Sequence, residues 1–193
     1  MFIDGQWGDA LDGGTFAVTD PATGAHLDDV PDGGSADAER AIEAANRAFD
    51  SWSQTTAHER ADVLLTAWRL MTERSDQRAE LMTREQGKPL RASRAEVTYA
   101  ADFLRFFAEE ATRVAGEWLP SKRADQRFLV VHQPVGVVAA VTPWNYPISM
   151  LTRKIGPALA AGCTVVLKPA EATPLCARAV YEVLHDAGVP AGV

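Results

Sequence analysis

The amino-acid sequence predicts an α/β protein in which helical layers precede the start of a parallel sheet. Hydrophobic residues recur at helical spacing through residues 38–107. Farther along the chain, two short and almost wholly apolar segments, 136–142 and 163–168, are each followed by a segment with a helical pattern. Apolar strands that alternate with helices are typical of a parallel sheet covered on both faces.

The first 30 residues are expected to form short strands and turns. Residues 2–7 are interpreted as a strand and a turn, and Thr15–Thr19 as a further strand. The sequence of Asp20–Gly24, which contains a proline and ends on a glycine, predicts the next turn.

Four helices are predicted in the next part of the chain. Ser35 is expected to cap the first helix, whose apolar positions continue to Trp52. Thr56 and Glu59 have the spacing of a capping box, which predicts the start of the second helix.

The third and fourth helices are predicted on either side of a Gly-Lys-Pro sequence. Ser75 is expected to start the third helix, which runs to Glu85 and is stopped by Gln86–Pro89. The fourth is expected over roughly residues 91–115, because apolar positions recur at helical spacing there. The aromatic residues expected on or near its buried side are Tyr99, Phe103, Phe106 and Phe107.

Residues 116–132 predict a β-hairpin that lies outside the helical body. The segment is polar, it contains the turn-like sequence Ser-Lys-Arg-Ala-Asp at 121–125, and it then alternates through 128–132.

The last part of the chain has the order strand, helix, strand, helix. A strand ending at Val141 leads into Thr142-Pro-Trp-Asn-Tyr-Pro147, and a helix follows over about 148–161. The strand 163–168 precedes a helix that Pro174 opens. Because a parallel sheet that stops at its second strand leaves an apolar edge exposed, a third strand is expected after Val193, and the sequence is interpreted as truncated.

Composition and charge exclude several classes of partner. The chain has 193 residues, of which 47% are hydrophobic and 23% are charged. Its net charge of −7 and its scattered basic residues argue against nucleic-acid binding. The N-terminus lacks the features of a signal peptide and no apolar run has membrane-spanning length, so we expect a cytoplasmic protein with no membrane partner.

Neither the cysteines nor the histidines predict a disulfide framework or a metal site. Cys163 and Cys176 lie in apolar surroundings, and the four histidines are scattered. Both cysteines are interpreted as small buried hydrophobic residues.

Ligands of open α/β sheets bind outside the carboxyl ends of the strands, which gives two candidate segments, 142–147 and 168–171. The chain contains no G-x-G-x-x-G phosphate loop, so a bound nucleotide would need its pyrophosphate held in another way.

The residues of these segments allow both a functional and a plain interpretation. Asn145 can donate to an oxyanion, or it can cap a helix or close a turn. Lys168 and Glu171 can bind the hydroxyls of a ribose, or they can form a salt bridge in a loop. Arg153 or Lys154 can face a pocket, or both can belong to a solvated helix face.

Five motifs, taken together, resemble the N-terminal part of the aldehyde dehydrogenase superfamily. They occur in the order and spacing of that family, and the resemblance covers essentially the whole chain. Residues 107–110 and 152–154 are most similar to its succinate-semialdehyde dehydrogenase branch. The motifs are Glu85–Pro89, Gln133–Val137, Thr142–Pro147, Gly156–Cys163 and Lys168–Glu171.

The resemblance implies an enzyme that oxidises an aldehyde to a carboxylic acid with NAD(P)⁺. In this family a cysteine attacks the carbonyl, hydride passes to the nicotinamide, and a glutamate helps water to hydrolyse the thioester. Asn145 matches the asparagine of the oxyanion hole. The residues expected to bind the cofactor are Thr142, Pro143 and Trp144 on the nicotinamide side, and Lys168 and Glu171 at the adenine-side ribose.

The resemblance also implies preferences for cofactor and substrate. The carboxylate of Glu171 should repel a 2′-phosphate, which favours NAD over NADP. Arg153 matches a position that pairs with the distal carboxylate of the substrate, so succinate semialdehyde or another short ω-oxo acid is expected. Lys154 matches a lysine near the site whose role stays open. Betaine aldehyde or another small aldehyde is the alternative substrate.

The expected domains are an incomplete NAD-binding domain, residues 1–115 and 133–193, and an oligomerisation hairpin, residues 116–132. A homo-oligomer, dimer or tetramer, is therefore expected of the whole enzyme. The catalytic domain, with the nucleophilic cysteine and the general-base glutamate, is absent from the chain, so we expect the chain alone to be inactive. The alternative of a different class is a non-catalytic module that binds nucleotide or pairs with other subunits.

Overall fold

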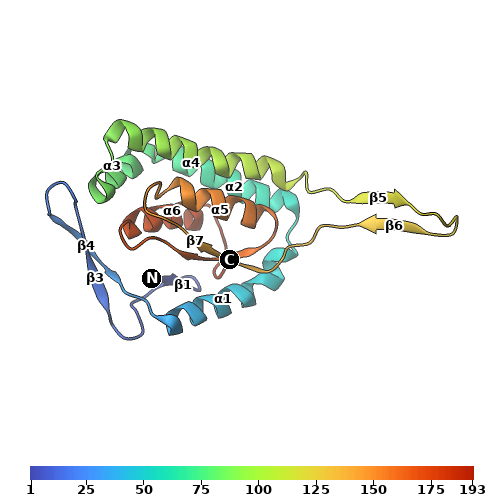
Figure 1. Ribbon diagram of the computed structural model, residues 1–193, viewed down its shortest axis with the longest axis horizontal. Coiled ribbons are helices and arrows are strands. Elements are labelled where there is room, and N and C mark those ends of the chain that lie inside the picture. The colour runs from blue at the N-terminus through green and yellow to red at the C-terminus, as the bar shows by residue number, and fades with distance from the viewer.

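A computed structural model describes residues 1–193. Figure 1 shows helices stacked above and below a short pair of strands, with one hairpin extending away from this body. No helix combines the length and the apolar character needed to cross a membrane. The strands are β1 (Phe2–Ile3), β2 (Gln6–Trp7), β3 (Thr15–Thr19), β4 (His26–Pro31), β5 (Glu117–Pro120), β6 (Arg127–Val130), β7 (Val137–Val141) and β8 (Thr164–Lys168). The helices are α1 (Ser35–Ser53), α2 (Ala57–Glu73), α3 (Ser75–Gln86), α4 (Leu90–Ala111), α5 (Ser149–Ala160) and α6 (Pro174–Asp186).

Hydrogen bonds to side chains near the N-terminus fix where helices α1 and α2 begin. In α2 the predicted capping box is confirmed: the Glu59 amide donates to the Thr56 hydroxyl over 3.2 Å, and the Thr56 amide donates to the Glu59 carboxylate over 2.7 Å. The cap predicted for α1 is wrong by one residue, because the cap is Gly34 and not Ser35. The Gly34 amide donates to the buried carboxylate of Asp37, which fills the third position of that helix.

Helix α3 ends as its sequence predicts. Gly87 follows its last residue with φ of +78°, a left-handed conformation that glycine adopts without steric cost. Lys88 and Pro89 connect this turn to Leu90, the first residue of α4. That helix ends at Ala111, a few residues before the expected boundary.

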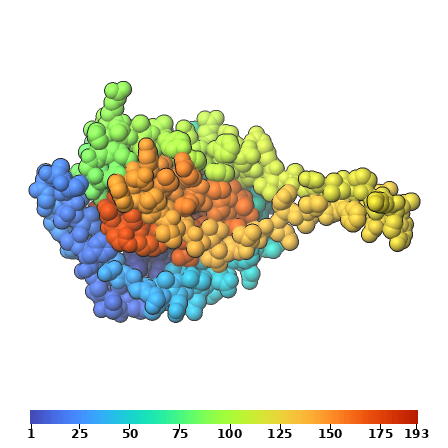
Figure 2. All heavy atoms as spheres, viewed as in Figure 1, coloured from blue at the N-terminus to red at the C-terminus, as the bar shows by residue number.

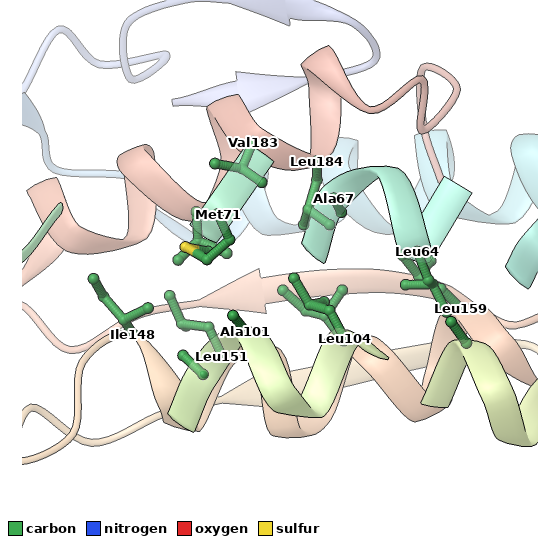
Figure 3. Packing of buried hydrophobic residues seen from close by; sticks show 14 of the residues in the cluster. Leu64, Ala67, Met71, Ala101, Leu104, Ile148, Leu151, Leu159, Val183 and Leu184 are labelled. Atoms are coloured by element: carbon green, nitrogen blue, oxygen red, sulfur yellow. The ribbon is translucent and has the colours of Figure 1, made fainter. Parts of the chain in front are cut away.

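The core lies between helices α2, α4, α5 and α6 (Figure 3). The buried stripe of α4 includes the small residues Ala100, Ala101 and Ala108. Small residues let neighbouring helices approach closely, and Gly156 of α5 serves the same contact, since a Cβ there would lie 3.1 Å from the Phe107 ring. The core residues labelled in Figure 3 are Leu64, Ala67, Met71, Ala101, Leu104, Ile148, Leu151, Leu159, Val183 and Leu184.

The expectation for the aromatic residues of α4 is wrong in two cases. Tyr99 and Phe106 are 45% and 55% exposed. Phe103 and Phe107 are partly buried. Because the helix already buries a stripe that contains Val97, Ala100, Leu104 and Ala108, Tyr99 and Phe106, which lie between these positions in the sequence, turn outward.

Strands β7 and β8 form the predicted parallel pair, in register from Val137 opposite Thr164 to Val141 opposite Lys168. Helices α1 and α5 both pack on β8. The Thr164 hydroxyl also donates to the carbonyl of Ala45 in α1 over 3.0 Å. Strand β8 is therefore covered by helices, which explains its apolar sequence. Strand β7 is more open, since only Ala140 of it is buried and Val141 is 66% exposed.

Three antiparallel hairpins complete the fold. Strand β4, which was not predicted, pairs with β3. Its charged residues Asp28 and Asp29 interrupt the apolar pattern by which a strand is recognised in a sequence. The predicted hairpin of residues 116–132 is confirmed as β5 and β6. It extends away from the body (Figures 1 and 2), and its Trp118 and Leu129 are 70% and 66% exposed.

Candidate functional site

The carboxyl ends of β7 and β8 bring the two candidate segments together. The Thr142 amide donates to the carbonyl of Lys168 over 3.2 Å and extends the parallel ladder by one residue. Residues 142–147 and 168–171 therefore leave the sheet side by side, as expected for a ligand site in an open α/β sheet.

Asn145 lies exposed at this edge of the sheet. Its side-chain amide is absent from the hydrogen bonds within the chain, so it does not cap α5. The N-terminus of α5 is held instead by the buried Glu96 of α4, whose Oε1 accepts from the amides of Ile148 over 3.0 Å and Ser149 over 3.2 Å. The carboxamide of Asn145 is thus free to donate to a ligand.

The backbone around Asn145 is held by the segment that links α3 to α4. Gln86 Nε2 donates to the carbonyls of Trp144 over 2.9 Å and Asn145 over 3.1 Å. Lys88 Nζ also donates to the Asn145 carbonyl over 3.1 Å, and it lies 4.4 Å from the centre of the Tyr146 ring. The same ammonium forms an ion pair with Glu96.

Glu85, one residue before Gln86, caps the N-terminus of α6, as Glu96 caps the N-terminus of α5. Its buried carboxylate accepts from the amides of Leu175 over 2.6 Å and Cys176 over 2.8 Å. Burial raises the pKa of Glu85, and the hydrogen bonds from Cys176 and Leu175 oppose that shift.

Both helices that follow the sheet strands therefore have a protein carboxylate at the N-terminus. A helix N-terminus is a common binding site for phosphate, and in α5 and α6 that site is occupied from within the chain. This arrangement fits the absence of a glycine phosphate loop after either strand.

Sequence reasoning missed Glu85, Gln86, Lys88 and Glu96 as residues that organise the site, although two signals were present. Glu85 lies in the last turn of α3, where the helix dipole disfavours a carboxylate. Glu96 lies at helical spacing within the apolar stripe of α4. A carboxylate in either position needs a partner outside its own helix.

Lys168 and Glu171 pair with each other in the loop after β8, and both side chains are exposed. The hydrogen bond from Lys168 lowers the pKa of Glu171, so its carboxylate is ionised near neutral pH. This pair is the loop salt bridge that the sequence allowed as the alternative to ribose binding. A hollow of about 290 Å³ adjoins this loop, and its lining includes Val18, Gln86, Trp144, Glu171 and Thr173.

Arg153 and Lys154 are both exposed on α5, but only Arg153 has partners within the chain. Its Nη2 donates to the hydroxyl of Tyr99 over 2.8 Å, and its guanidinium lies 5.0 Å from the centre of the Phe103 ring. Two aromatic side chains of α4 therefore orient the arginine.

The two cysteines are buried, as expected for small hydrophobic residues. Burial raises the pKa of the Cys176 thiol well above its usual range, and the neighbouring Glu85 carboxylate adds to the shift. A buried thiol of this kind is inert, because the thiolate is the reactive form.

Comparisons with known proteins agree on one family. The sequence pattern of the aldehyde dehydrogenase family matches residues 7–193. Glutarate-semialdehyde dehydrogenase of Pseudomonas putida is 53% identical over 192 residues, which are 100% of this chain and 40% of that protein. Succinate-semialdehyde dehydrogenase [NADP(+)] of Escherichia coli is 52% identical over 191 residues, 99% of this chain and 40% of that protein.

The fold agrees with the sequence comparisons. The crystal structure of an NADP-dependent enzyme of Escherichia coli superposes with a TM-score of 0.98 at 52% identity, over 100% of this chain and 40% of that one. The chain thus spans about 40% of the length of the relatives that it matches, and it reproduces the structure of that portion.

The capping role of Glu85 gives a prediction for stability. Glu85→Ala should lower the free energy of unfolding by about 1–3 kcal/mol, because the amides of Leu175 and Cys176 lose their acceptor inside the protein. Glu80→Ala, at an exposed position of the same helix, is the matched control and should change it by less than about 0.5 kcal/mol. Urea unfolding of both variants measures the difference, and equal midpoints would contradict the prediction.

Proposed function

This chain belongs to the aldehyde dehydrogenase family, and from that premise we propose that it supplies part of the cofactor site and one donor of the oxyanion hole in an NAD(P)-dependent enzyme. The proposed reaction is the oxidation of an aldehyde to its carboxylic acid. The observation that supports this most strongly is the free carboxamide of Asn145 at the carboxyl end of β7, beside the loop of Lys168 and Glu171.

Asn145 is the proposed oxyanion donor. When a nucleophile adds to an aldehyde, the carbonyl oxygen gains negative charge, and an N–H group already in place stabilises that charge without reorganisation. The hydrogen bonds from Gln86 and Lys88 to the backbone carbonyl of Asn145 fix the residue, which leaves its side chain as the group that faces the substrate.

The cofactor site that we propose consists of Thr142, Pro143 and Trp144 on one side and Lys168 and Glu171 on the other. When bound, NAD(P)⁺ supplies the hydride acceptor. Lys168 donates to a ribose hydroxyl and Glu171 accepts from one. Because the Glu171 carboxylate repels a 2′-phosphate, NAD is the proposed cofactor, although the name of one relative specifies NADP(+).

The proposed substrate is a short ω-oxo acid such as succinate semialdehyde. Arg153 can bind the distal carboxylate through its planar fork of N–H donors, and Tyr99 already orients it. The names of two relatives, glutarate-semialdehyde and succinate-semialdehyde dehydrogenase, belong to this chemical class. Lys154, the next residue, is kept as a second candidate residue of the substrate site, with no specific role assigned to it.

Residues 1–115 and 133–193 are the proposed portion of the NAD-binding domain, and residues 116–132 the proposed contact with another subunit of a dimer or tetramer. The exposed apolar side chains of Trp118 and Leu129 on a projecting hairpin support this assignment. Sedimentation of the protein with and without the change Trp118→Glu tests it, and identical oligomeric states would count against it.

We assign the nucleophile and the general base to residues outside 1–193. Both cysteines of the chain are buried, and neither is at the carboxyl ends of the strands. The chain alone should therefore fail to oxidise aldehydes. To measure what these residues contribute, we use a chimeric enzyme in which residues 1–193 replace the matching part of the Escherichia coli relative. The chain alone is the negative control.

In this chimera, Asn145→Ala should lower kcat on the order of 10²–10³-fold, the usual cost of losing one oxyanion donor. The KM for NAD should stay the same, because the carboxamide acts on the substrate oxygen. Asn46→Ala, at an exposed position of α1, is the matched control. Steady-state kinetics measures both, and an Asn145→Ala enzyme as fast as the unaltered one would contradict the oxyanion role.

The cofactor preference depends on the charge of Glu171. Glu171→Gln should reduce the preference for NAD over NADP, expressed as the ratio of kcat/KM values, by about five- to tenfold, since one repulsive charge at the surface is removed. Glu43→Gln, exposed on α1, should leave the ratio unchanged. The idea is wrong if the unaltered chimera uses NADP as well as NAD.

The substrate class depends on Arg153. Arg153→Leu should raise the KM for succinate semialdehyde by about 10- to 100-fold, because a charge-assisted contact to the carboxylate is lost. The KM for an uncharged aldehyde of similar length should stay the same. Arg84→Leu, an exposed arginine of α3, is the control. Equal effects on both substrates would remove the basis for an ω-oxo acid.

A further inference from the structure

We propose that Lys88 is a positioning residue for the carboxamide of Asn145. In this assignment the Lys88 ammonium, anchored on the buried carboxylate of Glu96, fixes the backbone of Asn145 and thereby sets the direction of its side chain. The inference rests on the proposed function, in which that carboxamide is the oxyanion donor.

The surroundings of Lys88 support a positioning role. Its side chain is only 15% exposed, and its Nζ contacts three groups at once. These are the carboxylate of Glu96, the carbonyl of Asn145 at 3.1 Å and the ring of Tyr146 at 4.4 Å. All three partners belong to the turn after β7 or to the residue that caps the helix after it.

Glu96 makes this arrangement rigid. One oxygen of its carboxylate accepts from the first amides of α5, at Ile148 and Ser149, and the other pairs with Lys88. Moving Lys88 away would leave a buried carboxylate without its counter-charge, which is costly in free energy. The N-terminus of α5 and the Lys88 ammonium are therefore both bound to the Glu96 carboxylate.

Hydrogen bonds hold the backbone at Asn145 and on both sides of it. Gln86 holds the carbonyl of Trp144, Lys88 and Gln86 hold that of Asn145, and Glu96 holds the amide of Ile148. The side chain of Asn145 itself makes no bond in the chain. Since nothing in the chain holds the carboxamide directly, its direction depends on the backbone to which it is attached.

A positioning role predicts a loss of turnover and not of binding. A donor displaced by about 1 Å from a developing charge costs up to about 10²-fold in rate, even when the change lies outside the reacting groups. Cofactor binding depends on the other loop, at Lys168 and Glu171, and should be unaffected.

The test uses a paired substitution, because Lys88→Met alone leaves Glu96 unpaired in the interior and risks unfolding. Lys88→Met/Glu96→Gln removes both charges, while the Gln side chain keeps an oxygen to accept from the start of α5. Arg91→Met is the matched control, since this exposed residue removes one positive charge nearby without touching the network. Thermal unfolding establishes that each variant is folded.

In the chimeric enzyme, Lys88→Met/Glu96→Gln should lower kcat by about 10- to 10²-fold with the KM for NAD unchanged. In the Asn145→Ala background the same pair of changes should lower kcat by less than about twofold, because residues that act as a unit are not additive. Arg91→Met should change neither constant. Lys88→Arg, which keeps the charge, should retain most of the activity.

A second measurement is independent of activity. In ¹⁵N spectra of residues 1–193, the side-chain NH₂ signals of Asn145 are assigned by their loss in Asn145→Ala. They should shift in Lys88→Met/Glu96→Gln and stay in place in Arg91→Met. Unmoved signals in the paired variant would overturn the positioning role.

The kinetic outcomes separate the two proposals. If Asn145→Ala leaves activity intact, the proposed function fails and the role of Lys88 fails with it. If Asn145→Ala is slow while Lys88→Met/Glu96→Gln turns over at the normal rate, only the role of Lys88 is refuted. The role of Lys88 is also refuted if the fold losses in kcat of Asn145→Ala and of Lys88→Met/Glu96→Gln simply multiply in the variant that carries all three substitutions.

Discussion

Two buried carboxylates hold together the edge of the sheet at which the candidate site lies. Glu96 accepts from the first amides of α5 and Glu85 from those of α6, and both come from helices that precede the sheet in the sequence. A buried carboxylate is stable only where donors surround it, so each one fixes the position of a helix start relative to α3 or α4. The turns after β7 and β8, which carry the exposed polar side chains, are attached to these two helix starts.

This constraint fits the absence of a glycine phosphate loop from the chain. In many nucleotide-binding folds the amides at the first helix start receive a phosphate. Here a side chain of the protein occupies that position, so the groups that this edge presents to solvent are exposed side chains such as Asn145, Lys168 and Glu171. The same occupation fixes the turns, as the oxyanion role proposed for Asn145 requires.

The outward face of α4 completes the arrangement. Its buried stripe packs on α2 and α5 through small residues, whereas Tyr99 and Phe106 are exposed and Phe103 and Phe107 are partly buried. Tyr99 and Phe103 there contact Arg153 of α5. One helix thus supplies the core, the cap of α5 through Glu96, and the surroundings of a candidate substrate-binding arginine. A change in its register would disturb all three.

The sequence by itself determined the fold class, the parallel order of β7 and β8, the projecting hairpin and the position of Asn145 at a strand end. These features depend on local periodicity, turn chemistry and motifs that the chain carries in consecutive residues. Only the tertiary structure decided what surrounds Asn145, because Gln86, Lys88 and Glu96 reach it across about 50 or more residues of chain. It also decided that Tyr99 and Phe106 face outward, since the helical pattern gives a stripe but the neighbouring helices select which stripe is buried.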